Sequence, residues 1–143
     1  MTEIIFYTFA EDRLDVARRV AAKAYGQGKQ VMIYAPDAAV AGAVDRMLWT
    51  TPALGFVPHA RDSDALAAET PVLIGADAGA LRHADVMINL DSAQPPAFGR
   101  FERLVEIVGT DDAEREQGRA RYRFYQSRGY ALKTHDLRQQ SEG

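Results

Sequence analysis

Three arginines and one tyrosine near the C-terminus have a spacing that would place them together on one helix: Arg115, Arg119, Tyr122 and Arg123. Residues three or four apart are neighbours on a helix surface, so three guanidinium groups would surround one phenol ring. A guanidinium binds a planar carboxylate through two parallel hydrogen bonds. The chain carries 17 basic and 20 acidic residues, so the cluster is a local basic site. It predicts binding of a short acidic partner, and the alternative is a solvated charged face.

No established catalytic or metal-binding motif accompanies this cluster. The sequence contains no G-x-x-x-x-G-K-[ST] phosphate loop, no G-x-S-x-G nucleophile elbow and no cysteine. Its three histidines, His59, His83 and His135, lack the close spacing of metal ligands. We therefore expect no catalytic residue, no metal ion and no cofactor.

One loop leaves an enzymatic alternative open. Gly75 and Gly79 follow an expected strand, where α/β folds commonly bind ligands, so the chain could be a small nucleotide-dependent α/β enzyme. No basic residue lies in this loop, and Asp77 would repel a phosphate. Direct binding of single-stranded nucleic acid by arginine and tyrosine stacking is disfavoured by the net charge of −3.

Two large aromatic residues flank the end of an expected helix and the proline-bearing loop after it. They are Trp49, the only tryptophan, and Phe56. Either both rings fill the core beneath the loop, or they form a patch that binds another protein, because aromatic side chains dominate interface hot spots. The residues alone leave both interpretations open.

Short apolar runs alternate with segments of helical periodicity along the chain. Runs such as IIFYTF and VMINL are too short for helices and are typical of buried strands. Strands are expected at 4–9, 31–35, 72–74, 86–90, 104–108 and 130–134, and helices at 14–25, 37–49 and 111–128. Continuously apolar strands separated by helices predict a three-layer α/β fold with a mainly parallel sheet and helices on both faces.

Length and composition indicate one domain with an ordinary core. The chain has 143 residues, of which 47% are hydrophobic and 26% charged. We expect the domain to span residues 1–140 and residues 141–143 to form a frayed tail. No apolar run approaches the roughly 20 residues of a membrane helix, and the N-terminus lacks the basic region of a signal peptide. We therefore expect a cytoplasmic protein without membrane contact.

Two sequence blocks resemble the chi subunit family of bacterial DNA polymerase III, an accessory of the clamp loader. One block is L-W-x-x-P-x-x-x-F-V-P-H at residues 48–59, and the other is R-x-R-Y-[KR]-x-Y-x-x-x-G-[FY] at residues 119–130. The opening strand with Phe6 and Tyr7 also matches. The resemblance spans nearly the whole chain and implies a Rossmann-like fold without a working nucleotide site.

The resemblance also implies partners. Chi-like proteins bind the acidic C-terminal tail of the single-stranded DNA-binding protein and also bind the psi subunit, so nucleic acid would be contacted only indirectly. The tail is expected to end in an apolar aromatic residue that follows aspartates. By position, the tail site would comprise Arg115, Arg119, Tyr122, Arg123 and Val108. The psi-facing patch would comprise Trp49, Pro52, Phe56 and Pro58. Residues 61–71 depart from the family in length and composition.

Overall fold

A computed structural model describes residues 1–50, 57–62, 70–76 and 84–140. Its seven-stranded sheet has the order β3-β4-β2-β5-β6-β1-β7, and every strand pair is parallel. The strands are β1 (Glu3–Ala10), β2 (Val31–Tyr34), β3 (His59–Arg61), β4 (Val72–Gly75), β5 (Val86–Asn89), β6 (Arg103–Gly109) and β7 (Leu132–Asp136). The helices are α1 (Arg13–Gly26), α2 (Ala38–Thr50), η3 (Phe98–Arg100), α3 (Asp112–Ser127) and α4 (Leu137–Gln140).

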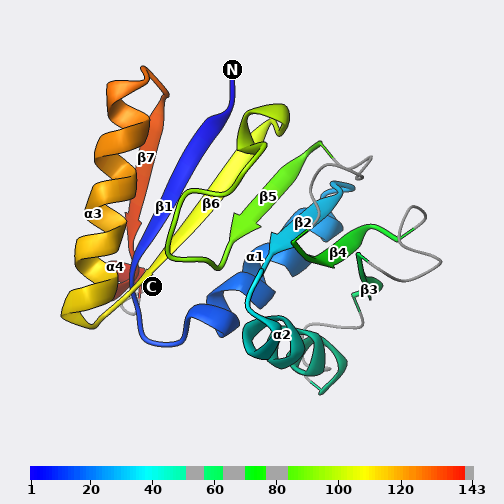
Figure 1. Ribbon diagram of the computed structural model, residues 1–143. Coiled ribbons are helices and arrows are strands. Elements are labelled where there is room, and N and C mark those ends of the chain that lie inside the picture. The colour runs from blue at the N-terminus through cyan, green and yellow to red at the C-terminus, as the bar shows by residue number, and fades with distance from the viewer. Residues whose placement is uncertain (51–56, 63–69, 77–83, 141–143) are drawn as a thin grey trace.

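The central strands are buried on both faces, as the continuous apolar runs predict. On β2, Val31 and Ile33 join one apolar core, whereas Met32 and Tyr34 join the other. The first core contains residues of α1 and α2, and the second contains Tyr125 of α3. Helices therefore cover both faces of the sheet, and Figure 1 shows α3 along β7 and β1, remote from α2. The expected three-layer α/β fold is confirmed.

Side-chain caps fix where α1 and α3 begin. Asp12 caps α1 by accepting the amide N–H groups of Leu14 and Asp15. Asp111 caps α3 by accepting the amide N–H of Glu114 at 2.8 Å. These contacts satisfy N–H groups that have no partner within the helix. Acidic residues in the first turn of α3 are further favoured by the helix dipole.

Two elements differ from the expectation. Strand β3 falls in a segment interpreted as loop, because the residues HAR form no apolar run and pair only with β4. The last strand begins at Leu132 and is followed directly by α4, which was not predicted. The expected tail at 141–143 lies outside the described residues. In the described part of the chain, no helix has the length and apolar character needed to cross a membrane.

Candidate functional site

A small cavity lies between α3 and the neighbouring strands. Its volume is about 220 Å³. The residues around it come from β1, β6, α3 and β7: Phe6, Thr8, Phe9, Val108, Arg115, Gly118, Arg119, Tyr122 and Thr134. The walls are mainly apolar and aromatic, whereas the α3 side carries two guanidinium groups. Such a cavity has room for one large apolar side chain, and is smaller than most drug-sized ligand sites.

Gly118 allows α3 to approach the sheet closely at this cavity. A Cβ atom at this position would lie 2.7 Å from one methyl carbon of Val108. One helical turn separates Arg115 from Arg119, and Tyr122 follows three residues later, so all three side chains border the cavity. The Tyr122 ring packs edge-on against Phe6, with centroids 5.3 Å apart.

The structure brings together four of the five residues predicted for the tail site. Val108, Arg115, Arg119 and Tyr122 all line the cavity. Arg123 lies outside it, with 63% of its side chain exposed and its Nη2 3.8 Å from Glu116 Oε1. Glu116 also accepts a hydrogen bond from Arg119 Nη1 at 3.0 Å. The Glu116 carboxylate is therefore shared by Arg119 and Arg123. With Arg115 included, there are three arginines to this one carboxylate, so the edge of the cavity keeps a net positive charge.

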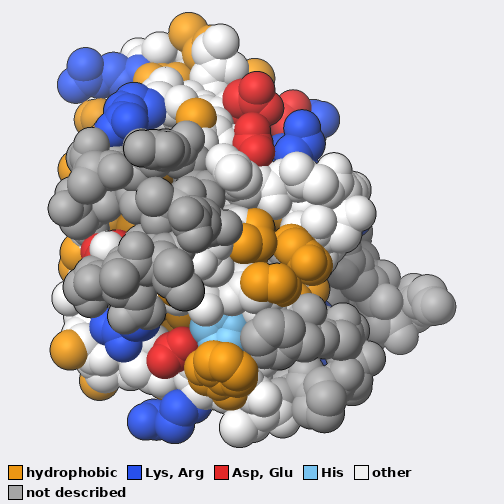
Figure 2. Space-filling view, turned by 90° about the vertical axis from the view of Figure 1, so that its right-hand side faces the viewer, with side chains coloured by type: hydrophobic (Ala, Val, Ile, Leu, Met, Phe, Trp, Pro, Cys, Tyr) orange, Lys and Arg blue, Asp and Glu red, His pale blue; other side chains and the backbone are white. Residues whose placement is uncertain are grey.

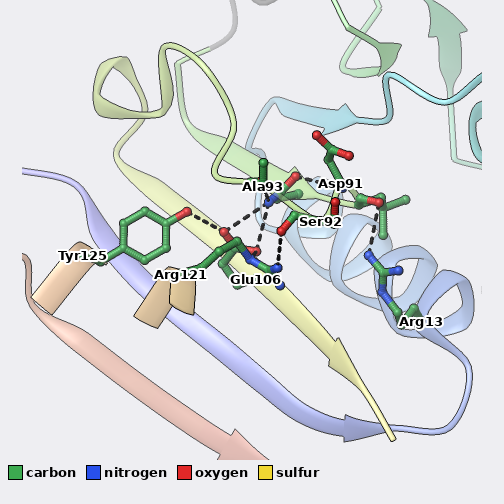
Figure 3. A network of polar contacts seen from close by, with 9 residues as sticks. Arg13, Asp91, Ser92, Ala93, Glu106, Arg121 and Tyr125 are labelled. Carbon is green, nitrogen blue, oxygen red and sulfur yellow. Dashed lines mark hydrogen bonds and ion pairs between the residues drawn. The ribbon is translucent and has the colours of Figure 1, made fainter. Parts of the chain in front are cut away.

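Two buried residues of α3, Arg121 and Tyr125, belong to a polar network that the sequence did not predict. Arg121 Nε donates to Glu106 Oε1 at 2.9 Å, and the Tyr125 hydroxyl donates to Glu106 Oε2 at 2.5 Å. Asn89 Nδ2 also donates to Glu106, and Arg121 Nη1 donates to the Ser92 carbonyl (Figure 3). A single acid in the apolar run LVEIV and a single amide in VMIN were the available signals.

The Glu106 carboxyl is completely buried. Burial raises its pKa, while the Arg121 charge and the hydrogen bonds from Tyr125 and Asn89 oppose that shift. Burial, together with the Glu106 charge, raises the pKa of Tyr125, so its hydroxyl stays neutral and donates. Because each buried group in the network has a partner, the network fixes α3 against β6.

The loop of the enzymatic alternative begins at Gly75, and residues 77–83, including Gly79, Asp77 and His83, lie outside the described residues. The Asp62 carboxylate accepts the Ala76 amide N–H at 2.9 Å. A Cβ on Gly75 would lie within 2.4 Å of three Asp62 side-chain atoms. A carboxylate therefore sits where a phosphate would have to bind, which disfavours a nucleotide at this position.

Trp49, one of the residues expected to face psi, lies near the end of α2, on the side of the molecule that carries β3 and far from α3 (Figure 1). Trp49 is 60% exposed, so the interpretation that it fills the core is wrong. Its ring packs edge-on against His59, with centroids 4.8 Å apart. Figure 2 shows exposed hydrophobic side chains beside a histidine on this face. Pro58 is half-buried, whereas Pro52 and Phe56 lie outside the described residues.

His59 is held by neighbouring groups of the fold. Its Nδ1 lies 2.7 Å from the Val57 carbonyl oxygen, and its Nε2 lies 3.2 Å from Asp45 Oδ1. Within the described ranges, no group of three or more His, Cys, Asp or Glu residues has the geometry to hold a metal ion.

The fold and the cavity define a three-layer α/β domain with a small apolar cavity edged by arginines. Comparison with known proteins gives its family. The family model described as "DNA polymerase III chi subunit, HolC" matches residues 1–133. The chain belongs to this family, whose members are accessory proteins of the bacterial replisome.

Curated relatives carry the same family name. The DNA polymerase III subunit chi of Pseudomonas aeruginosa is 36% identical over 141 residues, which cover 96% of this chain and 98% of the relative. The subunit chi of Haemophilus influenzae is 31% identical, with 86% of each chain covered. That of Escherichia coli is 29% identical over 80% of this chain and 79% of the relative. The resemblance drawn from the two sequence blocks is confirmed.

Proposed function

We propose that the α3 cavity binds the acidic C-terminal tail of the single-stranded DNA-binding protein, and that the chain links this protein to the DNA polymerase III clamp loader through a psi-type subunit. The observation that carries the proposal is an apolar cavity with Arg115 and Arg119 on one side, in a chi-family chain. The protein then contacts nucleic acid only indirectly, acts in the cytoplasm with the replisome, and needs neither catalysis nor a cofactor.

The apolar walls suit the terminal aromatic ring of such a tail. Phe6, Val108 and Tyr122 offer one aliphatic and two aromatic surfaces around a volume of about 220 Å³. Burying one large apolar side chain contributes about 1.5–3 kcal/mol. Aromatic pairs add about 0.5–1.5 kcal/mol beyond the buried area. The ring therefore supplies a substantial share of the binding free energy.

Arg119 is the first choice for the terminal carboxylate, because it lies beside Tyr122 on the cavity side of α3 and its side chain is 53% exposed. Arg115 then attracts the aspartates that precede the ring. Arg123 points away toward Glu116, so its contribution is attraction at longer range. A hydrogen bond to a charged group contributes about 1.5–3 kcal/mol, and ordering the tail offsets part of the sum. Micromolar affinity, about −8 kcal/mol, follows.

Arg119→Ala is expected to weaken binding of a tail peptide about 10- to 100-fold, because one charge-assisted contact of about 1.5–3 kcal/mol is lost. The measurement is a titration of a labelled peptide that ends in two aspartates, a short apolar spacer and a C-terminal phenylalanine. Affinity should also fall between low and high salt, since exposed charges are screened over about 10 Å at 0.1 M.

Arg128→Ala is the matched control. Arg128 is the C-cap residue that follows α3, and its guanidinium lies over the Phe124 ring, outside the cavity lining. It removes the same charge and should leave peptide affinity within about twofold of wild type. Equal affinities for wild type and Arg119→Ala would reject the assignment of the cavity as the tail site.

The β3 side supports the second part of the proposal. Trp49 exposes 60% of its surface, and large exposed aromatic residues are enriched at interface hot spots. His59 packs edge-on against the Trp49 ring, and Asp45 Oδ1 lies 3.2 Å from His59 Nε2. This position is remote from the α3 cavity, so one chain can bind two partners at the same time.

Trp49→Ala is expected to reduce affinity for a purified psi subunit at least tenfold, because hot-spot substitutions cost about 2 kcal/mol or more. Tail-peptide affinity should not change, and thermal stability should fall by no more than about 1 kcal/mol, since the ring is largely solvent-exposed. Tyr25→Ala removes another exposed aromatic residue and serves as the control. Undiminished psi binding by Trp49→Ala would place the psi interface elsewhere.

A further inference from the structure

Phe9 has an unusual backbone conformation at the edge of the cavity. Its φ angle is 59°, in the left-handed region that residues other than glycine rarely adopt. The pairing of β1 with β6 shifts between Tyr7 and Ala10, so β1 contains a bulge at this point. As a result Ala10 packs in the core beneath α1, while both Thr8 and Phe9 line the cavity. Strained residues of this kind concentrate at binding sites.

Two guanidinium groups lie over the Phe9 ring. The Arg115 Cζ is 5.1 Å from the ring centroid, and the Arg138 Cζ is 3.5 Å from it. Arg115 belongs to α3 and Arg138 to α4, so two helices on either side of β7 in the sequence each place an arginine over one ring. Contacts of this type stabilise the cation by about 0.5–2 kcal/mol in general, and they hold both side chains at the cavity edge.

Asp136 fixes the Arg138 side chain in this position. Its carboxylate accepts hydrogen bonds from Arg138 Nε at 3.0 Å and Nη2 at 2.6 Å. These bonds hold the pKa of Asp136 below its ordinary value, so the pair stays ionised at neutral pH. The side chain of Arg138 is nevertheless 63% exposed, which leaves it accessible to a ligand.

We propose that Phe9, Arg115 and Arg138 form a second subsite of the tail-binding cavity, which receives an acidic side chain upstream of the ligand's C-terminal residue. The inference rests on the proposed function and deepens it, since it adds a specificity-determining residue from α4. Arg119 lies about 5–6 Å from Arg115 along the helix. The Phe9 ring lies 5.1 Å beyond the Arg115 Cζ atom. An extended peptide advances about 3.3 Å per residue, so a carboxylate three residues before the C-terminus, about 10 Å along the peptide, reaches the Phe9 ring.

Arg138 lies beyond residues 1–133, the part of the chain that matches the family model. The subsite therefore combines Arg115 from the family region with a residue supplied by this chain's C-terminal segment. It predicts that an acid at this ligand position contributes to affinity through Arg138 as well as through Arg115.

A double-mutant cycle between protein and peptide tests the subsite. Two labelled peptides end in phenylalanine and differ only in Asp or Asn three residues before it. Arg138→Ala should weaken the Asp peptide about 2- to 5-fold and the Asn peptide less than about 1.5-fold, as expected for an exposed ion pair. Lys133→Ala is the matched control, because Lys133 is 64% exposed and pairs with Glu3 at the other end of β1. It should affect both peptides equally and weakly.

The outcomes separate the two proposals. If wild type binds the Asp peptide and Arg119→Ala weakens it, but Arg138→Ala behaves like Lys133→Ala with both peptides, the subsite is wrong and the tail site stands. If neither peptide binds wild type, both proposals are overturned. An Arg138→Ala loss that is confined to the Asp peptide supports the subsite.

Discussion

Replacing Arg121 by Met is expected to lower the free energy of unfolding by about 3–5 kcal/mol, because the change leaves the buried Glu106 carboxylate without its cationic partner. Arg121 is 4% exposed and Glu106 is fully buried. Methionine preserves much of the side-chain volume, so the loss comes from the uncompensated charge more than from a cavity. The hydrogen bonds from Tyr125 and Asn89 remain, but they replace only part of the lost interaction.

The measurement is urea unfolding of wild type and variant at pH 7. Arg119→Met is the control on the same helix, because Arg119 is exposed and its partner Glu116 is exposed as well. Surface pairs of this kind contribute about 0–1 kcal/mol. A destabilisation by Arg121→Met no larger than that of Arg119→Met would show that the network does not hold α3 on the sheet.

The pH dependence of the Arg121→Met variant supplies a second signature. Burial already raises the pKa of Glu106, and Arg121 is the largest influence that opposes it. Without Arg121 the folded-state pKa rises further above the unfolded value. Between the unfolded-state and the folded-state pKa of Glu106, the folded variant binds more protons than the unfolded one. The free energy of unfolding of the variant is therefore greatest at acidic pH. It should fall as pH rises toward the folded-state pKa, by up to about 1.4 kcal/mol per pH unit. The stability gap to wild type should therefore widen from pH 4 to pH 7.

The sheet could be predicted because its central strands are short runs of apolar residues, and such runs indicate buried strands in the sequence itself. Val31 to Tyr34 and Val86 to Ile88 are apolar on both faces, as central parallel strands require. The strand His59–Arg61 has no such pattern. Its three residues are only half-buried, and they form a strand because they pair with β4 at the edge of the sheet. Helix α4 has four residues, which are too few to show a helical periodicity in the sequence.

The cavity could be predicted only in part. Helical spacing shows which residues share one face of α3, but it does not show which part of the sheet that face lies against. At about 100° per residue, Arg123 lies roughly 80° around the helix from Arg115, enough to turn it from the cavity toward Glu116. Gly118, Arg121 and Tyr125 form the buried stripe of α3. Phe9 reaches the cavity through a bulge, which alternation along a strand does not predict.

Gly118 both packs against Val108 and lines the cavity. Gly118→Val is therefore expected to destabilise the protein by about 2–3 kcal/mol and to abolish tail-peptide binding. Intrinsic helix propensity favours replacing a mid-helix glycine, with alanine better by about 1 kcal/mol. A loss of stability must therefore come from packing. The new Cβ would lie 2.7 Å from a Val108 methyl carbon, and the added methyl groups would force α3 away from β6. Overpacking of this kind costs about 1–3 kcal/mol.

The same displacement closes or distorts the cavity, because Gly118 and Val108 both line it. Gly42 provides the control, since a Cβ there meets nothing within 4 Å, and Gly42→Ala should stabilise the protein by about 0.5–1 kcal/mol. Adding Val108→Ala to Gly118→Val should recover part of the lost stability, because it removes the methyl groups that clash. Thermal unfolding and peptide titration of all four proteins measure both effects. If Gly118→Val is as stable as wild type and binds the peptide normally, then close contact of α3 with β6 is not what shapes the cavity.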